Sequence, residues 1–313
     1  MLSIRHRQVF TRAALFLFLL TVFSSQAAQL PAHLKTAKDE FSVMTWNLMR
    51  YAHEDRDGDG QEDDLKPQKE CEAIFQVIAD EQPDIVAVQE MGNPDAFAHF
   101  TNGLTAKGLR YPHVEYLRRG GKQEINMAVL SRFPIAASQP ITNDTYSIGP
   151  AKLPVARGFI NVDIQPAPHY RFKLITAHLK AKVFHPLGQT EMRRNEARLL
   201  NKHVRQSLRK KPNLPILVVG DMNDTYNSAA LREVIGKDTR HLFDIRPRDQ
   251  LGTVWTYYGS GDDTYSRIDY MLASRGMAQQ LVKQKCRASG NLLCREGSDH
   301  RPLLSVFRIP SAP

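Results

Sequence analysis

The chain has 313 residues, of which 42% are hydrophobic and 24% charged, and its formal net charge is +9 at pH 7. This is the composition of an ordinary globular protein with a full hydrophobic core, and it excludes a polytopic membrane protein because no segment after the N-terminal leader is apolar enough to span a bilayer. The basic balance favours encounter with polyanions such as nucleic acid or anionic lipid, without deciding the fold.

The first 28 residues read as a separate leader. Three arginines precede the apolar run "AALFLFLLTVF" at 13–23, and the small and polar residues "SSQAA" follow it. This layout is typical of a secretory signal peptide cleaved near Ala27 or Ala28. The alternative is an uncleaved anchor, but the run is well short of the roughly 20 residues that a spanning helix needs. We therefore expect an exported, periplasmic or extracellular protein with no stable membrane anchor after cleavage, which would lower the net charge to +6 by removing those three arginines.

Predicted strands and helices alternate along the mature chain. "FSVMTWN" at 41–47 is a strand by its β-rich composition, and a helix is expected over 67–81, where a proline suits the first turn. "DIVAVQE" at 84–90 is almost continuously apolar, which is typical of a strand buried on both faces. Further strands are predicted at 125–131, 158–164, 171–179, 215–221, 267–273 and 303–309.

One long helix is predicted over 189–211. Apolar residues recur there at helical spacing, among them Met192, Leu200 and Val204, while the other face is dense with Arg and Lys. That basic face is either a polyanion-binding surface or a solvated one, and the sequence leaves both open. No linker or repeat interrupts residues 39–310, so we expect one α/β domain with sheets packed on each other and helices outside.

Three cysteines lie in the mature chain. Cys71 shares a helical face with Ile74 and Ile78, which predicts a buried core residue. Cys286 and Cys294 bracket the short segment "RASGNLL". An oxidising compartment would permit a disulfide between them, and we expect one, with two free buried thiols as the alternative.

Polar residues end several predicted strands. Any one of them is an ordinary place for a strand to stop, since Asn and Asp favour turns. Together they indicate a rim on which functional groups converge, because such groups gather at strand ends and loops held by a rigid scaffold. The residues concerned are Asn47, Glu90, His178, Asp221, Asn223, Asp269, Asp299 and His300.

These endings belong to a series of short motifs. "TWN", "QE", "ARG", "TAHL", "GDMND", "RIDY" and "SDH" occur in this order along nearly the whole mature chain. The series resembles the endonuclease/exonuclease/phosphatase superfamily, which includes pancreatic deoxyribonuclease. Each motif is weak alone, but the ordered set is specific. The resemblance implies a four-layer α/β/β/α sandwich, in which two packed mixed sheets are flanked by helices, together with a divalent metal and hydrolysis of phosphate esters.

Phosphodiester hydrolysis explains why acids and amides are needed. The anionic diester repels hydroxide, so a catalyst must neutralise its charge, activate water and stabilise the leaving oxygen. Glu90 is expected to be the principal metal ligand, with Asn47 and Asp299 nearby, because hard oxygen donors suit Mg²⁺ or Mn²⁺. The resemblance adds His178 and Arg157 as phosphate contacts.

Four further residues would carry the proton transfers and phosphate binding. Asp221 and Asn223 lie two positions apart, so both can face one side of an extended strand end, one to position or deprotonate water and the other to donate to a phosphate oxygen. A hydrogen bond from His300 to Asp269 would aim the other ring nitrogen at the substrate and favour the imidazolium. Whether His300 or Asp221 is the general base is left open by the sequence.

The segment "DRDGDGQEDD" at 55–64 is an acidic loop. It begins like an EF-hand, but the twelfth position is Lys66 where a bidentate Glu is expected, so an EF-hand is not predicted. The spacing also resembles calcium loops of extracellular repeat proteins, and a solvated Asp/Gly turn is the alternative. The four candidate calcium ligands are Asp55, Asp57, Asp59 and Asp63.

The leading hypothesis from the sequence is a secreted, monomeric, metal-dependent phosphodiester hydrolase that acts on nucleic acid. A phosphatase or phospholipase C-like enzyme acting on inositol phosphates or sphingomyelin is the second, disfavoured because no aromatic hairpin for membrane contact is evident. A non-catalytic binding module is the third, and it would be expected to have lost Glu90, Asp221 or His300, all of which are present. Fold and site type alone do not identify the leaving group.

Overall fold

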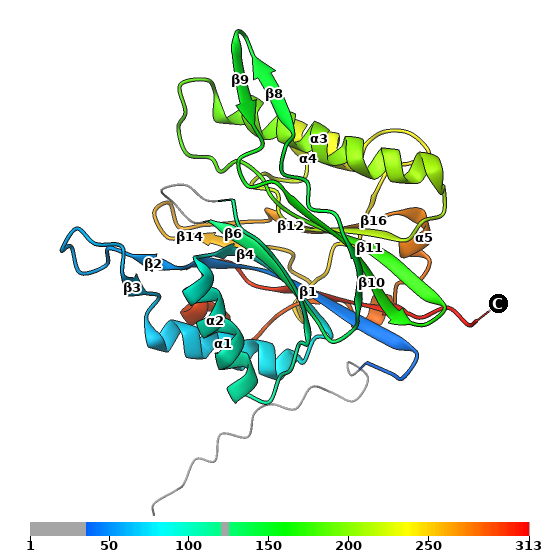
Figure 1. Cartoon of the computed structure of the whole chain (residues 1–313), viewed down its shortest axis with the longest axis horizontal. Helices are drawn as coiled ribbons and strands as arrows, with labels where there is room; N and C mark the ends of the chain where they lie inside the picture. The colour runs from blue at the N-terminus through cyan, green and yellow to red at the C-terminus, as the bar shows by residue number, and fades with distance from the viewer. Residues whose placement is uncertain (1–35, 120–124, 313) are drawn as a thin grey trace, which may run out of the picture.

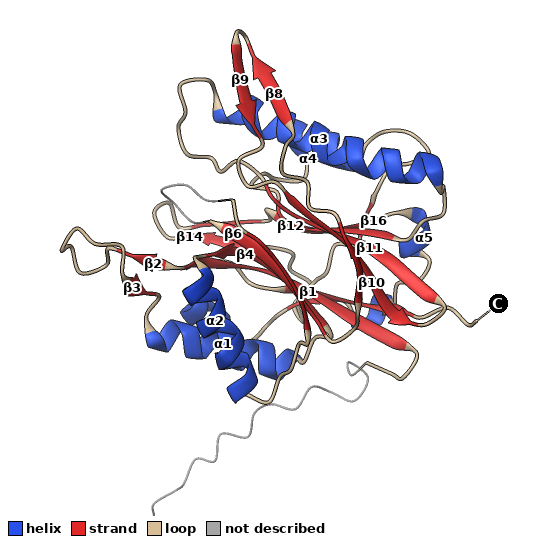
Figure 2. Ribbon diagram, in the orientation of Figure 1, coloured by secondary structure: helices blue, strands red, loops and turns tan. Residues whose placement is uncertain are grey.

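The computed structural model describes residues 36–119 and 125–312, so the expected signal peptide lies outside the described residues. Across these residues the chain forms two six-stranded sheets stacked face to face. Helices α1 and α2 cover the outer face of one sheet, and α3 and α4 cover the outer face of the other (Figure 1; Figure 2). The predicted four-layer α/β/β/α sandwich is confirmed.

The first sheet has the strand order β17-β18-β1-β4-β6-β5. Its central strand β1 pairs in parallel with β4 and antiparallel with β18, which makes the sheet mixed. The strands are β1 (Glu40–Tyr51), β4 (Ile85–Met91), β5 (His113–Leu117), β6 (Asn126–Ser131), β17 (Arg287–Ala288) and β18 (Leu303–Arg308).

The second sheet has the order β13-β16-β12-β11-β10-β7. It is mixed in the same way, because β12 pairs in parallel with β11 and antiparallel with β16. The strands are β7 (Ile135–Ser138), β10 (Phe159–Ala167), β11 (Tyr170–His178), β12 (Ile216–Asp221), β13 (Phe243–Asp244) and β16 (Asp269–Ala273).

Alternation along β1 shows how the layers are built. Phe41 and Val43 point inward to the core between the two sheets, whereas Met44, Trp46 and Leu48 point outward to the core under α1 and α2. Both sets are buried, as expected for a strand with side chains on alternating faces and cover on each side. The run of apolar residues in β1 therefore fills two cores at once.

The helices and short ribbons complete the fold. The helices are α1 (Gln68–Glu81), α2 (Pro94–Ala106), α3 (Gln189–Lys210), α4 (Ala229–Ile235), α5 (Arg275–Ala278), α6 (Cys294–Gly297) and the 3₁₀ turn η2 (Lys283–Lys285). Three antiparallel ribbons join β2 (His53–Glu54) to β3 (Asp64–Leu65), β8 (Thr145–Ile148) to β9 (Ala151–Pro154), and β14 (Tyr257–Gly259) to β15 (Thr264–Ser266). Helix α2 and these ribbons were not expected from the sequence.

Several arginines of α3 are already paired with acids. Arg194 lies 3.3 Å from Glu233, and Arg205 lies 2.6 Å from Asp238. The helix packs its apolar face on β11, β12 and β16. Of the two alternatives left open for the basic face, the pairings favour a solvated, ion-paired surface.

The expected disulfide is wrong. Cys71, Cys286 and Cys294 are all free. Cys286 lies just before β17, where its thiol donates to the Val282 carbonyl, whereas Cys294 is buried at the start of α6 against the core under α1. The two thiols therefore lie in different surroundings on either side of β17 in the sequence. Cys71 is fully buried, as predicted.

In the described part of the chain, no helix combines the length and the apolar character that crossing a membrane requires.

Candidate active site

Strand pairing brings the predicted polar ends together. In the second sheet, His178 is opposite Asp221 and Asp221 is opposite Asp269, so three neighbouring strands place these side chains in one row. In the first sheet, Asn47 is opposite Gln89, which puts Glu90 one position beyond it. Both rows lie at the same edge of the sandwich, since Asn47 Nδ2 donates to Asp221 Oδ2 across the two sheets at 3.1 Å.

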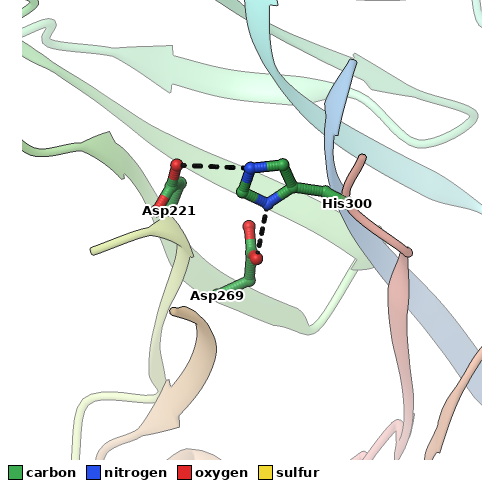
Figure 3. Close-up of side chains that lie close together, drawn as sticks. All are labelled: Asp221, Asp269 and His300. Atoms are coloured by element: carbon green, nitrogen blue, oxygen red, sulfur yellow. Dashed lines mark hydrogen bonds and ion pairs between the residues drawn. The ribbon is translucent and has the colours of Figure 1, made fainter. Parts of the chain in front are cut away.

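A histidine between two aspartates forms the centre of the site (Figure 3). His300 Nδ1 lies 2.7 Å from Asp269 Oδ2, and His300 Nε2 lies 3.9 Å from Asp221 Oδ2. All three side chains are buried, and each offers an atom within 4.8 Å of the others. The predicted Asp269–His300 hydrogen bond is present, and the second ring nitrogen faces Asp221.

The backbone around His300 is fixed by bonds to both sheets. Its N–H donates to the Ser298 hydroxyl, which in turn donates to the Asn47 carbonyl. Its carbonyl accepts from the Trp46 indole N–H at 3.0 Å. The Thr256 hydroxyl accepts from the Asp269 N–H at 3.0 Å. The Asp269–His300 pair is therefore positioned by buried groups, which is the condition for a preorganised site.

The surroundings set opposite charge states for the two histidines. Burial alone would lower the pKa of His300, but the Asp269 carboxylate, its hydrogen bond and the Asp221 and Asp299 carboxylates raise it to about 10. Burial, together with the nearby charges of Arg157 and His300, holds the pKa of His178 well below its ordinary range. His300 is therefore the cation of the site, and His178 is a neutral imidazole at physiological pH.

Asp221 is the acid best suited to accept a proton near neutral pH. Burial, and then the charge of Asp269, raise the pKa of Asp221 to about 7, although the charge of His300 acts in the other direction. Asp221 Oδ1 accepts the Asn223 N–H at 2.7 Å, and Asp221 Oδ2 accepts from Asn47. The carboxylate is thus held by hydrogen bonds while its proton affinity is tuned upward.

Glu90 is held at the cleft by an unusual backbone. Its φ is +60°, and in the neighbouring strand β1 the irregular turn at Met49 and Arg50 has φ +48° and +55°. Arg50 N–H donates to Glu90 Oε2 at 2.9 Å, and Asn47 Nδ2 donates to Glu90 Oε1 at 3.1 Å. Left-handed conformations at non-glycine residues cost energy and gather at functional sites, so this turn is a feature of the site and not of the core.

The surroundings of Asp299 indicate whether a hard divalent cation fits this site. Its Oδ1 atom is buried and makes no hydrogen bond with any described residue. Burial raises the pKa of Asp299, opposed by the charge of His300 and reinforced by that of Glu90. Two carboxylates, one of them with a buried oxygen that makes no hydrogen bond in the described part of the chain and lies 3.9 Å from His300 Nε2, form a donor set that suits Mg²⁺ or Mn²⁺. The amide of Asn47 donates to Glu90 through Nδ2, and its Oδ1 accepts from Met49 N–H at 3.0 Å.

Two of the expected phosphate-binding residues donate hydrogen bonds to the same backbone carbonyl. Arg157 Nη1 and Asn223 Nδ2 both donate to the Leu179 carbonyl, at 3.0 and 2.9 Å. The neighbouring His178 has its Nε2 3.5 Å from Asp221 Oδ2, and its buried Nδ1 has no hydrogen bond within the described residues. The structure therefore brings Arg157, His178 and Asn223 to one wall of the cleft beside Asp221.

The structure also adds a buried lysine that sequence reasoning assigned only to the acidic loop. Lys66 is 2% exposed, and its ammonium donates to the Met49 carbonyl at 2.8 Å and pairs with Glu70 at 2.7 Å. It thereby holds the turn that presents Arg50 N–H to Glu90. Its position four residues before Glu70 on the chain was a signal for the ion pair, but nothing local signalled the contact with Met49.

The acidic loop joins β2 to β3 and is exposed. Carboxylate oxygens of Asp55, Asp57 and Asp64 lie within 4.8 Å of one another, so Asp64 takes the place expected for Asp63, and Asp59 accepts instead from the Gln61 N–H. A β-ribbon flanks the loop where an EF-hand would have helices. Calcium binding here stays a prediction.

Known proteins resemble this chain in both sequence and fold. The sequence profile of the Endonuclease/Exonuclease/phosphatase family matches residues 44–300, which is most of the chain. The chain belongs to this family. No curated protein sequence gives a significant match.

Solved structures of this family share the fold at low identity. The human Nocturnin catalytic domain with bound sulfate is similar at a TM-score of 0.61 and 18% identity, over 87% of this chain and 96% of that one. ANGEL2, a 2',3'-cyclic phosphatase, gives 0.61 and 17%, over 86% and 95%. Sphingomyelinase C from Streptomyces griseocarneus gives 0.59 and 14%, over 86% and 99%. At these identities the likeness concerns the fold, and the family membership makes the chain a phosphoric ester hydrolase by class.

Proposed function

We propose that this family member is an exported, divalent-metal-dependent phosphodiesterase whose substrate is a nucleic acid. The observation that carries the proposal is the buried group Asp269, His300 and Asp221, with the carboxylates of Glu90 and Asp299 close enough to shift its charges. Its basic net charge supports a polyanionic substrate, and its N-terminal leader supports export.

Each residue has a role that its environment supports. Asp221, with its raised pKa, accepts the proton of the attacking water. His300 keeps its proton, because Asp269 holds Nδ1, and presents charge to a phosphoryl oxygen. Arg157 and Asn223 orient the phosphate from the opposite wall.

A metal ion would be held by Glu90 and Asp299, with Asn47 beside them. When bound, such a cation supplies positive charge to the phosphoryl and leaving oxygens. Glu90 is held in place by hydrogen bonds from Arg50 N–H and Asn47, and Asp299 brings a buried oxygen that makes no hydrogen bond with the described residues. Of the two general bases considered, Asp221 is the better supported, because the pKa of His300 is raised to about 10, which keeps its imidazole protonated near neutral pH, whereas the pKa of Asp221 is raised only to about 7.

The test is hydrolysis by the purified protein with Mg²⁺ or Mn²⁺ of duplex DNA, single-stranded DNA, RNA, a 2',3'-cyclic nucleotide, inositol phosphates and sphingomyelin vesicles. We expect metal-dependent cleavage of at least one nucleic acid, abolished in Asp221→Asn. Exclusive turnover of sphingomyelin or inositol phosphates would contradict the substrate proposal, and no turnover of any ester would contradict the enzyme. Export is tested by the N-terminal sequence of protein recovered outside the cytoplasm, which should begin after Ala27 or Ala28.

A further inference from the structure

A cavity of about 760 Å³ opens directly beside the catalytic pair. Asp299 and His300 form part of its lining, so it is continuous with the site described above. The rest of the lining is rich in large side chains that the proposed chemistry does not use, chiefly Leu251, Trp255, Tyr258, Tyr265, Leu292 and Arg295. These residues come from the loop before β14, the β14–β15 ribbon, and the segment around α6.

One wall of the cavity is aromatic. The Tyr265 ring lies 4.8 Å from Trp255 in an edge-on arrangement and 4.8 Å from Tyr258 in a tilted one. Tyr265 remains 49% exposed, with the Arg295 guanidinium 5.9 Å from its ring centre. No aromatic hairpin was expected from the sequence, but "TYYGSGDDTYS" at 256–266 forms one by pairing of β14 with β15.

Backbone hydrogen bonds fix the position of the aromatic wall relative to Asp299 and His300. Tyr258 N–H donates to the Asp299 carbonyl at 2.9 Å, and Arg301 N–H donates to the Thr256 carbonyl at 2.8 Å. The Arg301 guanidinium lies 3.8 Å from the Trp255 ring centre and fixes it from below. A group stacked on this wall would therefore keep a defined distance from a phosphate at His300.

The charges around the wall exclude a choline headgroup. Aromatic pockets bind quaternary ammonium through the ring faces, but Arg295 already lies over both Trp255 and Tyr265, at 6.0 and 5.9 Å from their centres. A second cation there would be repelled. A neutral planar group, with polar edges for Arg295, would avoid this repulsion.

We propose that this cavity binds a nucleobase adjacent to the scissile phosphate. The inference rests on the proposed nuclease function and adds a subsite to it. Base stacking on exposed tyrosine is favourable and tolerant of sequence, and a single sugar separates the base from the phosphate. Leu251 and Leu292 at the cavity mouth, 88% and 87% exposed, would cover the base from the other side.

The experiment compares single-stranded oligonucleotides carrying one scissile region with versions in which each nucleotide in turn is replaced by an abasic tetrahydrofuran residue. For wild type, we expect the abasic substitution at one position next to the cleaved phosphate to lower kcat/KM by about tenfold or more, the scale of one base-stacking contact. Tyr265→Ala should cause a similar loss with the intact strand and no further loss with that abasic strand.

Controls separate stacking from folding. Tyr265→Phe keeps the ring but removes the hydroxyl that accepts from Arg295 at 2.9 Å, so it should retain more activity than Tyr265→Ala. Leu292→Ser, in an exposed position, should reproduce part of the loss without lowering the thermal midpoint. Phe243→Ala is the matched control, because Phe243 is an exposed aromatic packed on His241 and lies opposite Ala273, at the far end of β16 from Asp269. It should leave cleavage unchanged.

Two outcomes would overturn the subsite. Equal cleavage of intact and abasic strands by wild type, with Tyr265→Ala unchanged, would reject it while leaving the nuclease intact. Loss of sphingomyelin hydrolysis in Tyr265→Ala, with oligonucleotide cleavage unaffected, would assign the wall to lipid. If wild type cleaves no oligonucleotide at all, the proposed function itself fails.

Discussion

Replacing Asp269 by Asn should disable the site without unfolding it. The variant keeps the size of the side chain but removes the charge that His300 Nδ1 meets at 2.7 Å. An amide at this place can donate to the ring as well as accept from it, so His300 loses both its preferred tautomer and its proton. The nearest measured parallel is the triad aspartate of serine proteases, where the same exchange leaves geometry intact and activity low.

The size of the loss follows from that distance. Unit charges 2.7 Å apart at an effective dielectric constant of about 20 attract by roughly 6 kcal/mol. Burial of both groups offsets about half of this, because desolvation opposes the pairing. The remaining ~3 kcal/mol, if expressed in the transition state, corresponds to roughly a 10²-fold fall in kcat.

The assay is steady-state hydrolysis of the best substrate at saturating Mg²⁺, with the thermal midpoint measured alongside. The matched control is Asp144→Asn, which alters another His–Asp pair: Asp144 lies 2.5 Å from His203, on α3 outside the cleft. We expect kcat to fall only in Asp269→Asn, with KM and midpoint near wild type. Equal kcat in wild type and Asp269→Asn would refute the charge assignment to His300.

Three further changes test the surrounding structure. Glu90→Gln keeps the hydrogen bond from Arg50 but loses the charge, so activity should fall and the Mg²⁺ titration should shift to higher concentration; an unchanged titration would remove Glu90 from the metal site. Lys66→Met should raise the Mg²⁺ requirement by about 10- to 100-fold through the Met49 turn, whereas a change in midpoint alone would make Lys66 merely structural. For Asp249, burial acts to raise the pKa, but hydrogen bonds from Thr253 and Arg301 hold it at about 2, below the ordinary 3.8. Its stabilising effect is present above pH 3.8 and lost as pH falls towards 2, so Asp249→Asn should flatten the fall of the midpoint over that window, as measured by calorimetry.

The layers and the catalytic rim were predictable because both are encoded locally. Apolar runs such as 84–90 mark doubly covered strands, and parallel pairing places their carboxyl ends at one edge. Asn47, Glu90 and Asp221 lie in the carboxyl-terminal parts of β1, β4 and β12, so their convergence required only the correct layer order. His300 instead lies between α6 and β18, and its place in the site depends on contacts with distant residues such as Trp46.

The remaining features depend on contacts between distant segments. Cys286 and Cys294 are close enough in sequence for a disulfide to be expected. The short strand β17 lies between them, and both thiols are free. The role of Lys66 depends on Met49, and the aromatic wall depends on pairing of β14 with β15 and on its bonds to Asp299. The pattern of apolar residues within one segment does not show which distant segments come into contact. The proposed base-binding wall could therefore be found only from the structure.

The most direct test of the account is a single-turnover reaction in heavy-oxygen water with excess enzyme, Mg²⁺ and a nucleic acid substrate, followed by mass spectrometry of the products. The account predicts that the label enters the new terminal phosphate, since Asp221 activates water for attack at phosphorus, and that Asp221→Asn forms almost no product. Label in the hydroxyl product, or equal product formation by Asp221→Asn, would contradict it.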